Sequence, residues 1–79
     1  MIDKLPHSYV KDVADSLRQD GLGEQADKIE NVHVGIFNAT ELFMAWRWHL
    51  GLVLRLEKIS EHTKLLAAVA VDYFNGHLD

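Results

Sequence analysis

The stretch from Asn38 to Ser60 limits the fold of this chain more than any other part of the sequence. When it is projected as a helix at about 100° per residue, apolar side chains cover most of the circumference. Four positions make the only consistent polar strip: Thr40, Arg47, Arg55 and Lys58. A surface helix needs a single apolar stripe, so this helix requires two or more neighbours to cover it. The stretch therefore predicts an all-α fold, a small bundle built around one long helix.

The start of this long helix carries the strongest local signal in the chain. The Asn38 side chain is placed to accept the N–H of the third helical residue, and Glu41 is placed to reach back to the Asn38 N–H. Phe37 and Leu42 occupy the positions of a hydrophobic staple. We expect the helix to begin directly after Asn38 and to span residues 39–59.

An amphipathic helix is predicted near the N-terminus. Pro6 suits a first helical position, because a proline lacks the N–H that would go unused there. The following apolar residues share one helical face: Val10, Val13, Ala14 and Leu17. Gly21 can adopt the left-handed conformation that ends a helix, and Leu22 stands where a Schellman motif places a hydrophobic residue.

A second helix must run back against the first, because the connection through Gly23 is very short. Its apolar stripe is narrow and consists of Leu22, Ala26 and Ile29. Residues 32–37 alternate apolar and other side chains, so loop, strand and helix all remain open for them. A lone strand has no partner, so we expect an irregular connection whose apolar residues cover the core.

The chain is expected to break near Ser60 and to form a last helix that ends at about Phe74. Asn75 and Gly76 form a plausible C-cap pair for that helix. A continuous helix through Ser60 stays an alternative, but it could not fold back within a domain of 79 residues. We therefore predict one helical domain, residues 1–79, with an amphipathic hairpin packed on a long apolar helix and a C-terminal helix.

Composition narrows the class of protein. The chain has no cysteine, which excludes disulfide bonds and thiolate metal sites. Its formal net charge of −4 disfavours nucleic acid and anionic membranes as partners. The N-terminus has no secretory pattern, and Arg47, His49 and Arg55 interrupt the apolar stretch, so a membrane span is not expected. We expect a cytoplasmic protein.

No catalytic, phosphate-binding or metal-binding motif is recognisable, so we expect a protein that is not an enzyme and needs no cofactor. His33, His62 and His77 lack the i, i+4 pairing of a zinc-binding helix. His49 lies on the apolar arc of the long helix. We interpret it as a core histidine, and the alternatives are contact with its own copy across a twofold axis and metal ligation.

The tryptophan pair suggests packing rather than a ligand site. Trp46 and Trp48 point about 160° apart on a helix, so they cannot share one stacking site, and core or interface packing is favoured. Arg47, Trp48 and Arg55 are candidate contacts for an acidic segment of a partner protein.

The main functional hypothesis is a non-enzymatic interaction or scaffold module that forms a homodimer. The first two helices offer too little apolar surface to cover the last two, and uncovered apolar surface normally marks an interface. The candidate interface residues are Leu42, Trp46, His49, Val53 and Leu56.

Two other hypotheses remain. One is a small acidic inhibitor of the immunity or antitoxin type, which would bind a basic protein through the carboxylates of residues 12–30. The other is an apolar pocket for a small molecule, with Tyr9, Trp46 or His49 as its polar groups.

Overall fold

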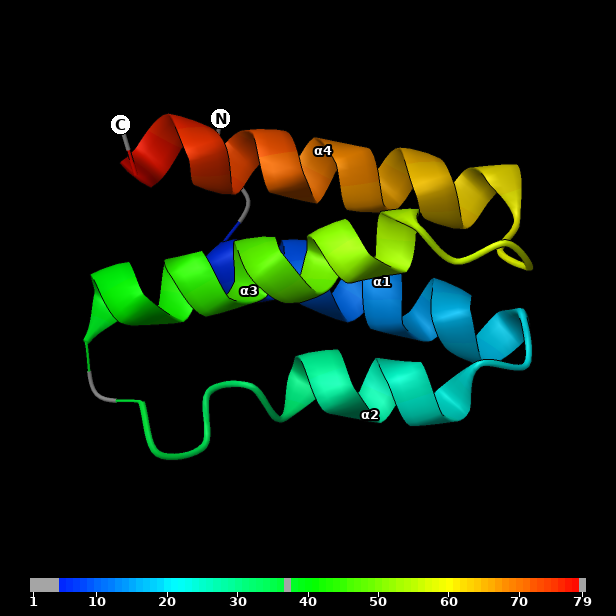
Figure 1. The fold of residues 1–79 in the computed structure, drawn as a ribbon, viewed down its shortest axis with the longest axis horizontal. Helices are drawn as coiled ribbons and strands as arrows, with labels where there is room; N and C mark the ends of the chain where they lie inside the picture. Colours follow the sequence, from blue (N-terminus) through cyan, green and yellow to red (C-terminus); the bar gives the residue numbers. More distant parts are fainter. Residues whose placement is uncertain (1–4, 37, 79) are drawn as a thin grey trace.

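Two antiparallel helical hairpins pack on each other in the computed structural model, which describes residues 5–36 and 38–78. The helices are α1 (Pro6–Gln19), α2 (Gly23–Glu30), α3 (Ala39–Leu54) and α4 (Glu61–Leu78). In Figure 1, α3 lies in front of α1, with α4 on one side and α2 on the other. The predicted all-α bundle is confirmed, and no strand occurs in the described residues.

The turn between α1 and α2 is a complete Schellman motif. Gly21 has a φ of 82°, in the left-handed region. The Leu22 N–H donates to the Leu17 carbonyl at 2.8 Å, and the Gly21 N–H donates to the Arg18 carbonyl at 3.1 Å. The predicted end of the first helix is therefore confirmed.

A single hydrophobic core takes side chains from all four helices. The apolar stripes predicted for the first two helices supply its α1 and α2 faces, with Leu17 and Ile29 among the largest buried side chains. The second hairpin contributes Trp46, Leu50 and Phe74. Burial of each such side chain stabilises the fold by roughly 1.5–3 kcal/mol before conformational entropy is subtracted.

The connection between α2 and α3 consists of turns over residues 31–36, so the prediction of an irregular segment is confirmed for that part. The expectation that its apolar residues cover the core is wrong for Val34, which is exposed. The reason is local, because two turns and a glycine at φ 83°, Gly35, direct this part of the connection outward. Phe37, and with it the staple to Leu42, lies outside the described residues.

Helix α3 begins as predicted and ends early. Asn38 Oδ1 accepts the Glu41 N–H at 3.1 Å, which confirms the part of the predicted cap that the Asn38 side chain makes. We expected the helix to continue to residue 59, but it stops at Leu54. The chain must turn there, because Ile59 enters the core and Ser60 begins the next helix beside α1.

A polar network holds the start of α4 against the end of α1. The Ser60 hydroxyl accepts the Thr63 N–H at 3.2 Å and caps α4, which confirms the predicted break. The Asp20 carboxylate accepts the Ser60 N–H at 3.0 Å and the Thr63 hydroxyl at 2.6 Å. Ser16 Oγ lies 2.5 Å from Thr63 Oγ1. These contacts fix the two hairpins at one end of the bundle.

Helix α4 passes through the expected stop. Asn75 and Gly76 lie inside the helix, which reaches Leu78, so the predicted C-cap is wrong. Packing explains the extension: Phe74 is fully buried, and Arg47 Nη1 of α3 donates to Asn75 Oδ1 at 3.0 Å. Within residues 5–36 and 38–78, none of the helices combines the length and apolar character needed to cross a membrane.

Candidate functional site

The solvent-facing side of α3 is apolar at its centre. Met44 is 50% exposed, Trp48 is 65% exposed and Leu52 is 41% exposed. The three residues are spaced four apart, so they lie close to one line along the helix. None of the described helices crosses in front of this side of α3 (Figure 1). We call the residues within about 60° of that line the outer stripe: Glu41, Met44, Ala45, Trp48, Gly51, Leu52 and Arg55.

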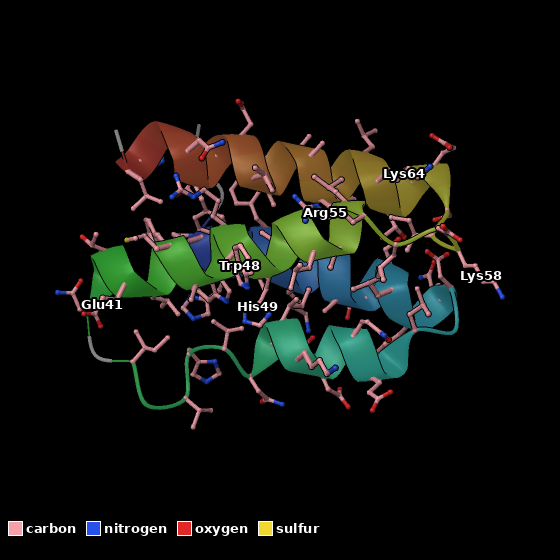
Figure 2. The ribbon with its side chains drawn as sticks, in the orientation of Figure 1. Glu41, Trp48, His49, Arg55, Lys58 and Lys64 are labelled. Atoms are coloured by element: carbon pink, nitrogen blue, oxygen red, sulfur yellow. The ribbon has the colours of Figure 1, made fainter. Side chains whose placement is uncertain are left out.

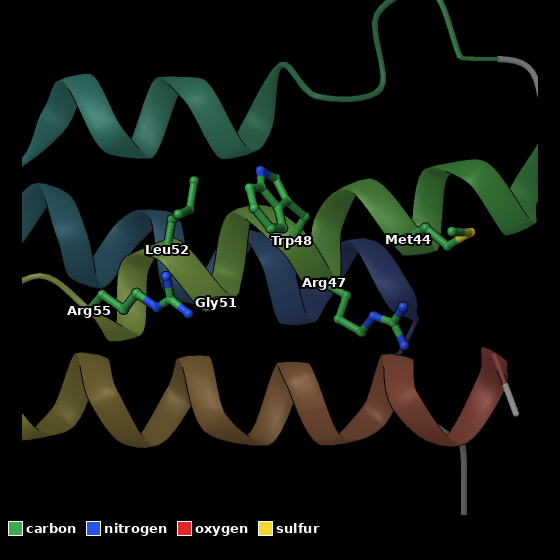
Figure 3. Close-up of a pocket in the computed structure, with 6 residues that line it drawn as sticks. All are labelled: Met44, Arg47, Trp48, Gly51, Leu52 and Arg55. Atoms are coloured by element: carbon green, nitrogen blue, oxygen red, sulfur yellow. The ribbon is translucent and has the colours of Figure 1, made fainter.

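The outer stripe is hollowed at Gly51. An open hollow of about 340 Å³ is lined by Met44, Arg47, Trp48, Gly51, Leu52 and Arg55 (Figure 3). Trp48 extends away from α4, whereas Arg47 extends toward it (Figure 3). A Cβ added at Gly51 would meet no atom within 4 Å, so packing inside this chain does not require a glycine there.

Opposite charges stand at the two ends of the stripe. Glu41 lies seven residues before Trp48 and Arg55 lies seven residues after it. Both side chains are exposed, and Figure 2 shows them at opposite ends of α3 with Trp48 between them. Neither takes part in an ion pair with another described residue. The stripe therefore has an apolar centre between an anion and a cation.

The interface residues predicted from sequence lie on the other sides of α3. Trp46 is 1% exposed and Val53 is 3% exposed, so in this fold these two side chains pack in the core of the chain. Leu42 and Leu56 are half-buried against the core. His49 is half-buried and lines a hollow of about 200 Å³ next to α2. These residues face the chain itself because α1, α2 and α4 cover them.

The three candidate partner-binding residues separate into two groups. Trp48 and Arg55 lie together on the outer stripe. Arg47 also borders the hollow, but its guanidinium is bound to Asn75 of α4. Of the predicted polar strip, Arg47 thus contacts α4, whereas Thr40, Arg55 and Lys58 are exposed.

The residues proposed as polar groups of one small-molecule pocket are dispersed. Tyr9 stacks on Tyr73 with ring centroids 4.3 Å apart. Trp46 and His49 line different hollows. The three side chains therefore lie in separate surroundings.

Trp46 has an unusual environment for a core residue. Its Nε1 is buried without a hydrogen-bond partner in the described part of the chain. The indole meets the His7 ring edge-on, with centroids 5.0 Å apart, and lines a hollow of about 260 Å³ that also includes Lys11 and His33. Sequence reasoning missed this cluster, because its members come from α1, α3 and the α2–α3 connection.

Three acidic residues of α1 and α2 lie around one arginine. Arg18 binds Glu30 at 2.7 Å and Asp27 at 2.9 Å, with Asp15 at 3.5 Å. Hydrogen bonding to Arg18 lowers the pKa of the Glu30 carboxyl. These carboxylates are therefore partly neutralised within the chain and present a weaker negative field to a partner.

Neither metal-binding geometry nor comparison with known proteins adds evidence on the function of the outer stripe. In the described ranges, 5–36 and 38–78, no three histidine or acidic side chains come together in a way that could hold a metal ion. No family model matches the chain, no curated protein matches it, and no solved structure matches it.

Proposed function

We propose that this protein is a non-enzymatic interaction module that self-associates through the outer stripe of α3. The observation that supports this is the exposure of Met44, Trp48 and Leu52 along one line of a well-formed helix. Contiguous apolar surface of this kind marks interaction sites, and tryptophan, methionine and arginine are enriched at the centres of interfaces. The same helix was expected to mediate association, but the proposed contact is on its opposite side.

Small size also favours association. A domain of 79 residues buries a limited fraction of its surface and has a thin margin of stability. A second copy that binds only the folded state adds stability that grows with the logarithm of its concentration above the Kd. An exposed tryptophan at the centre of the contact would supply much of the binding energy.

The acidic-inhibitor hypothesis receives less support. A basic partner would have to compete with Arg18, which already binds Glu30 and Asp27. The exposed apolar residues of α3 would have no role in such a complex. Self-association accounts for them directly.

Oligomeric state tests the proposal. Light scattering from about 1 μM to about 1 mM should show the mass rising from 9.0 kDa toward twice that value. Trp48→Asp should keep the chain monomeric. Leu65→Asp is the matched control, because Leu65 is as exposed as Trp48 but lies on α4, outside the outer stripe.

Two results would count against the proposal. One is a mass of 9.0 kDa over the whole concentration range. The other is a dimer that Leu65→Asp disrupts and Trp48→Asp leaves intact.

A further inference from the structure

We propose that two copies of α3 pair antiparallel about a twofold axis that passes beside Trp48, so that Glu41 of each copy meets the partner's Arg55. This inference rests on the proposed function, and it adds the register and direction of the contact. The occupant of the outer stripe is a second copy of this chain.

Spacing along the helix supports the register. In an antiparallel pair centred on one residue, positions equally far before and after that residue face each other across the axis. With Trp48 at the centre, Met44 faces the partner's Leu52, four residues to either side. At seven residues to either side, Glu41 faces the partner's Arg55. Apolar thus meets apolar, and each anion meets a cation.

Charge decides the direction. In a parallel pair with the same centre, Glu41 would meet a second Glu41 and Arg55 a second Arg55. Both contacts would be repulsive, whereas the antiparallel pair makes two attractive contacts. Each side chain is exposed and has no other ion-pair partner among the described residues, so both are available.

Shape supplies a second, independent argument. Two indoles related by a twofold axis cannot both lie on the axis, so each must pass to one side. The hollow of about 340 Å³ at Gly51 borders Trp48 and is open to solvent (Figure 3). A glycine weakens a helix, and no contact within the chain requires one at this position. In the proposed dimer the partner's indole fills this hollow, and the role of Gly51 is to leave space for it.

Cross-linking tests the direction. The chain has no cysteine, so introduced thiols react without background. We expect a Met44→Cys chain mixed with a differently tagged Leu52→Cys chain to form a mixed disulfide under mild oxidation. Met44→Cys alone should cross-link poorly. Efficient cross-linking of Met44→Cys to itself would show a parallel pair and overturn the inference.

Charge reversal tests the register. Glu41→Arg or Arg55→Glu alone turns two attractive contacts into two repulsive ones, and we expect each to raise the dimer Kd about tenfold. The double variant restores both contacts and should return the Kd to within about threefold of the original. Glu24→Arg and Lys58→Glu make the same charge changes outside the stripe and serve as controls. Unchanged affinity in both single variants, or no recovery in the double variant, would contradict the register.

Filling the hollow separates binding from folding. Gly51→Leu should stabilise the isolated helix and raise the Tm of the dilute monomer, because leucine favours a helix more than glycine does. It should also raise the dimer Kd at least tenfold by occupying the space for the partner's indole. A Gly51→Leu chain that dimerises as well as the original would overturn this part of the inference.

Failure of the inference can be told apart from failure of the proposed function. If the original chain is monomeric at all concentrations, the proposed function fails. Suppose instead that the chain dimerises and that Trp48→Asp prevents this. If Met44→Cys then cross-links efficiently to itself and the single charge variants keep the original affinity, self-association holds and the antiparallel register is wrong.

Discussion

The Thr63 hydroxyl donates a hydrogen bond of 2.6 Å to the Asp20 carboxylate, and so joins the first turn of α4 to the residue that follows α1. Thr63 is fully buried, at 0% exposure, and its oxygen also accepts from Ser16. The contact spans 43 positions of the sequence. Together with the hydrogen bonds of Ser60 to Asp20 and of Ser16 to Thr63, it aligns the two hairpins.

Removal of this hydroxyl should destabilise the fold. Thr63→Val keeps the shape of the side chain but removes the partner of the buried Ser16 hydroxyl and one of the hydrogen bonds to Asp20, which keeps those from Ser60. We expect a loss of about 1–3 kcal/mol in the free energy of unfolding. Urea titration followed by circular dichroism measures it. Thr63→Ser keeps the hydroxyl and is the control. A Thr63→Val chain as stable as the original, or a larger loss in Thr63→Ser than in Thr63→Val, would contradict the prediction.

The stability should fall in acid. Hydrogen bonds from the Ser60 N–H and the Thr63 hydroxyl lower the pKa of the Asp20 carboxyl, and Arg18 lowers that of Glu30. Unfolded carboxyls titrate near pH 4, so folding favours the deprotonated forms. This contribution is fully present above about pH 5 and is lost as pH falls through the lower folded-state pKa values.

Urea midpoints measured from pH 7 to strong acid check this dependence. Asp20→Asn should be less stable at neutral pH and should show a shallower decline in acid, because one titrating acceptor has been removed. The reverse slope, with stability rising as pH falls, would contradict the assignment.

The glycine at the end of α1 should be sensitive to substitution. Gly21→Ala places a Cβ on a residue with φ 82°, and we expect a cost of about 1–2 kcal/mol in stability. Gly23→Ala is the control, because Gly23 starts α2 and has the same open space around it without a positive φ. Thermal unfolding of both variants tests the prediction. A loss at Gly23 as large as that at Gly21 would show that backbone conformation is not the cause.

Substitution of the two tryptophans by alanine should have very different effects on the stability of the fold. Trp46→Ala opens a cavity in the core and should cost about 3–5 kcal/mol in the free energy of unfolding. Trp48→Ala should change the stability of the dilute monomer by less than about 0.5 kcal/mol, since the side chain is exposed. Denaturation at low concentration distinguishes them. A large loss at Trp48 in the dilute monomer would show that its indole packs within the chain.

Local signals in the sequence were read correctly where the cause lies within one or two helical turns. The glycine turn at Gly21, the cap at Asn38 and the hydrogen bond from the Thr63 N–H to the Ser60 hydroxyl each join residues that are close in the sequence. The α1 stripe was equally clear, since its apolar residues occupy a single face. Helix α3 is apolar nearly all round, so the distribution of its apolar residues does not indicate which side faces the core.

Four helices, their order and the unusual apolar surface of the long helix follow from the amino-acid sequence alone. The tertiary structure sets the directions of Trp46, inward, and Trp48, outward, because these depend on where α1, α2 and α4 lie around α3. It also decided that α3 stops at Leu54 and that α4 continues through Gly76. These outcomes follow from contacts such as Asp20 with Thr63 and Arg47 with Asn75, which join residues far apart in the chain and leave no local pattern.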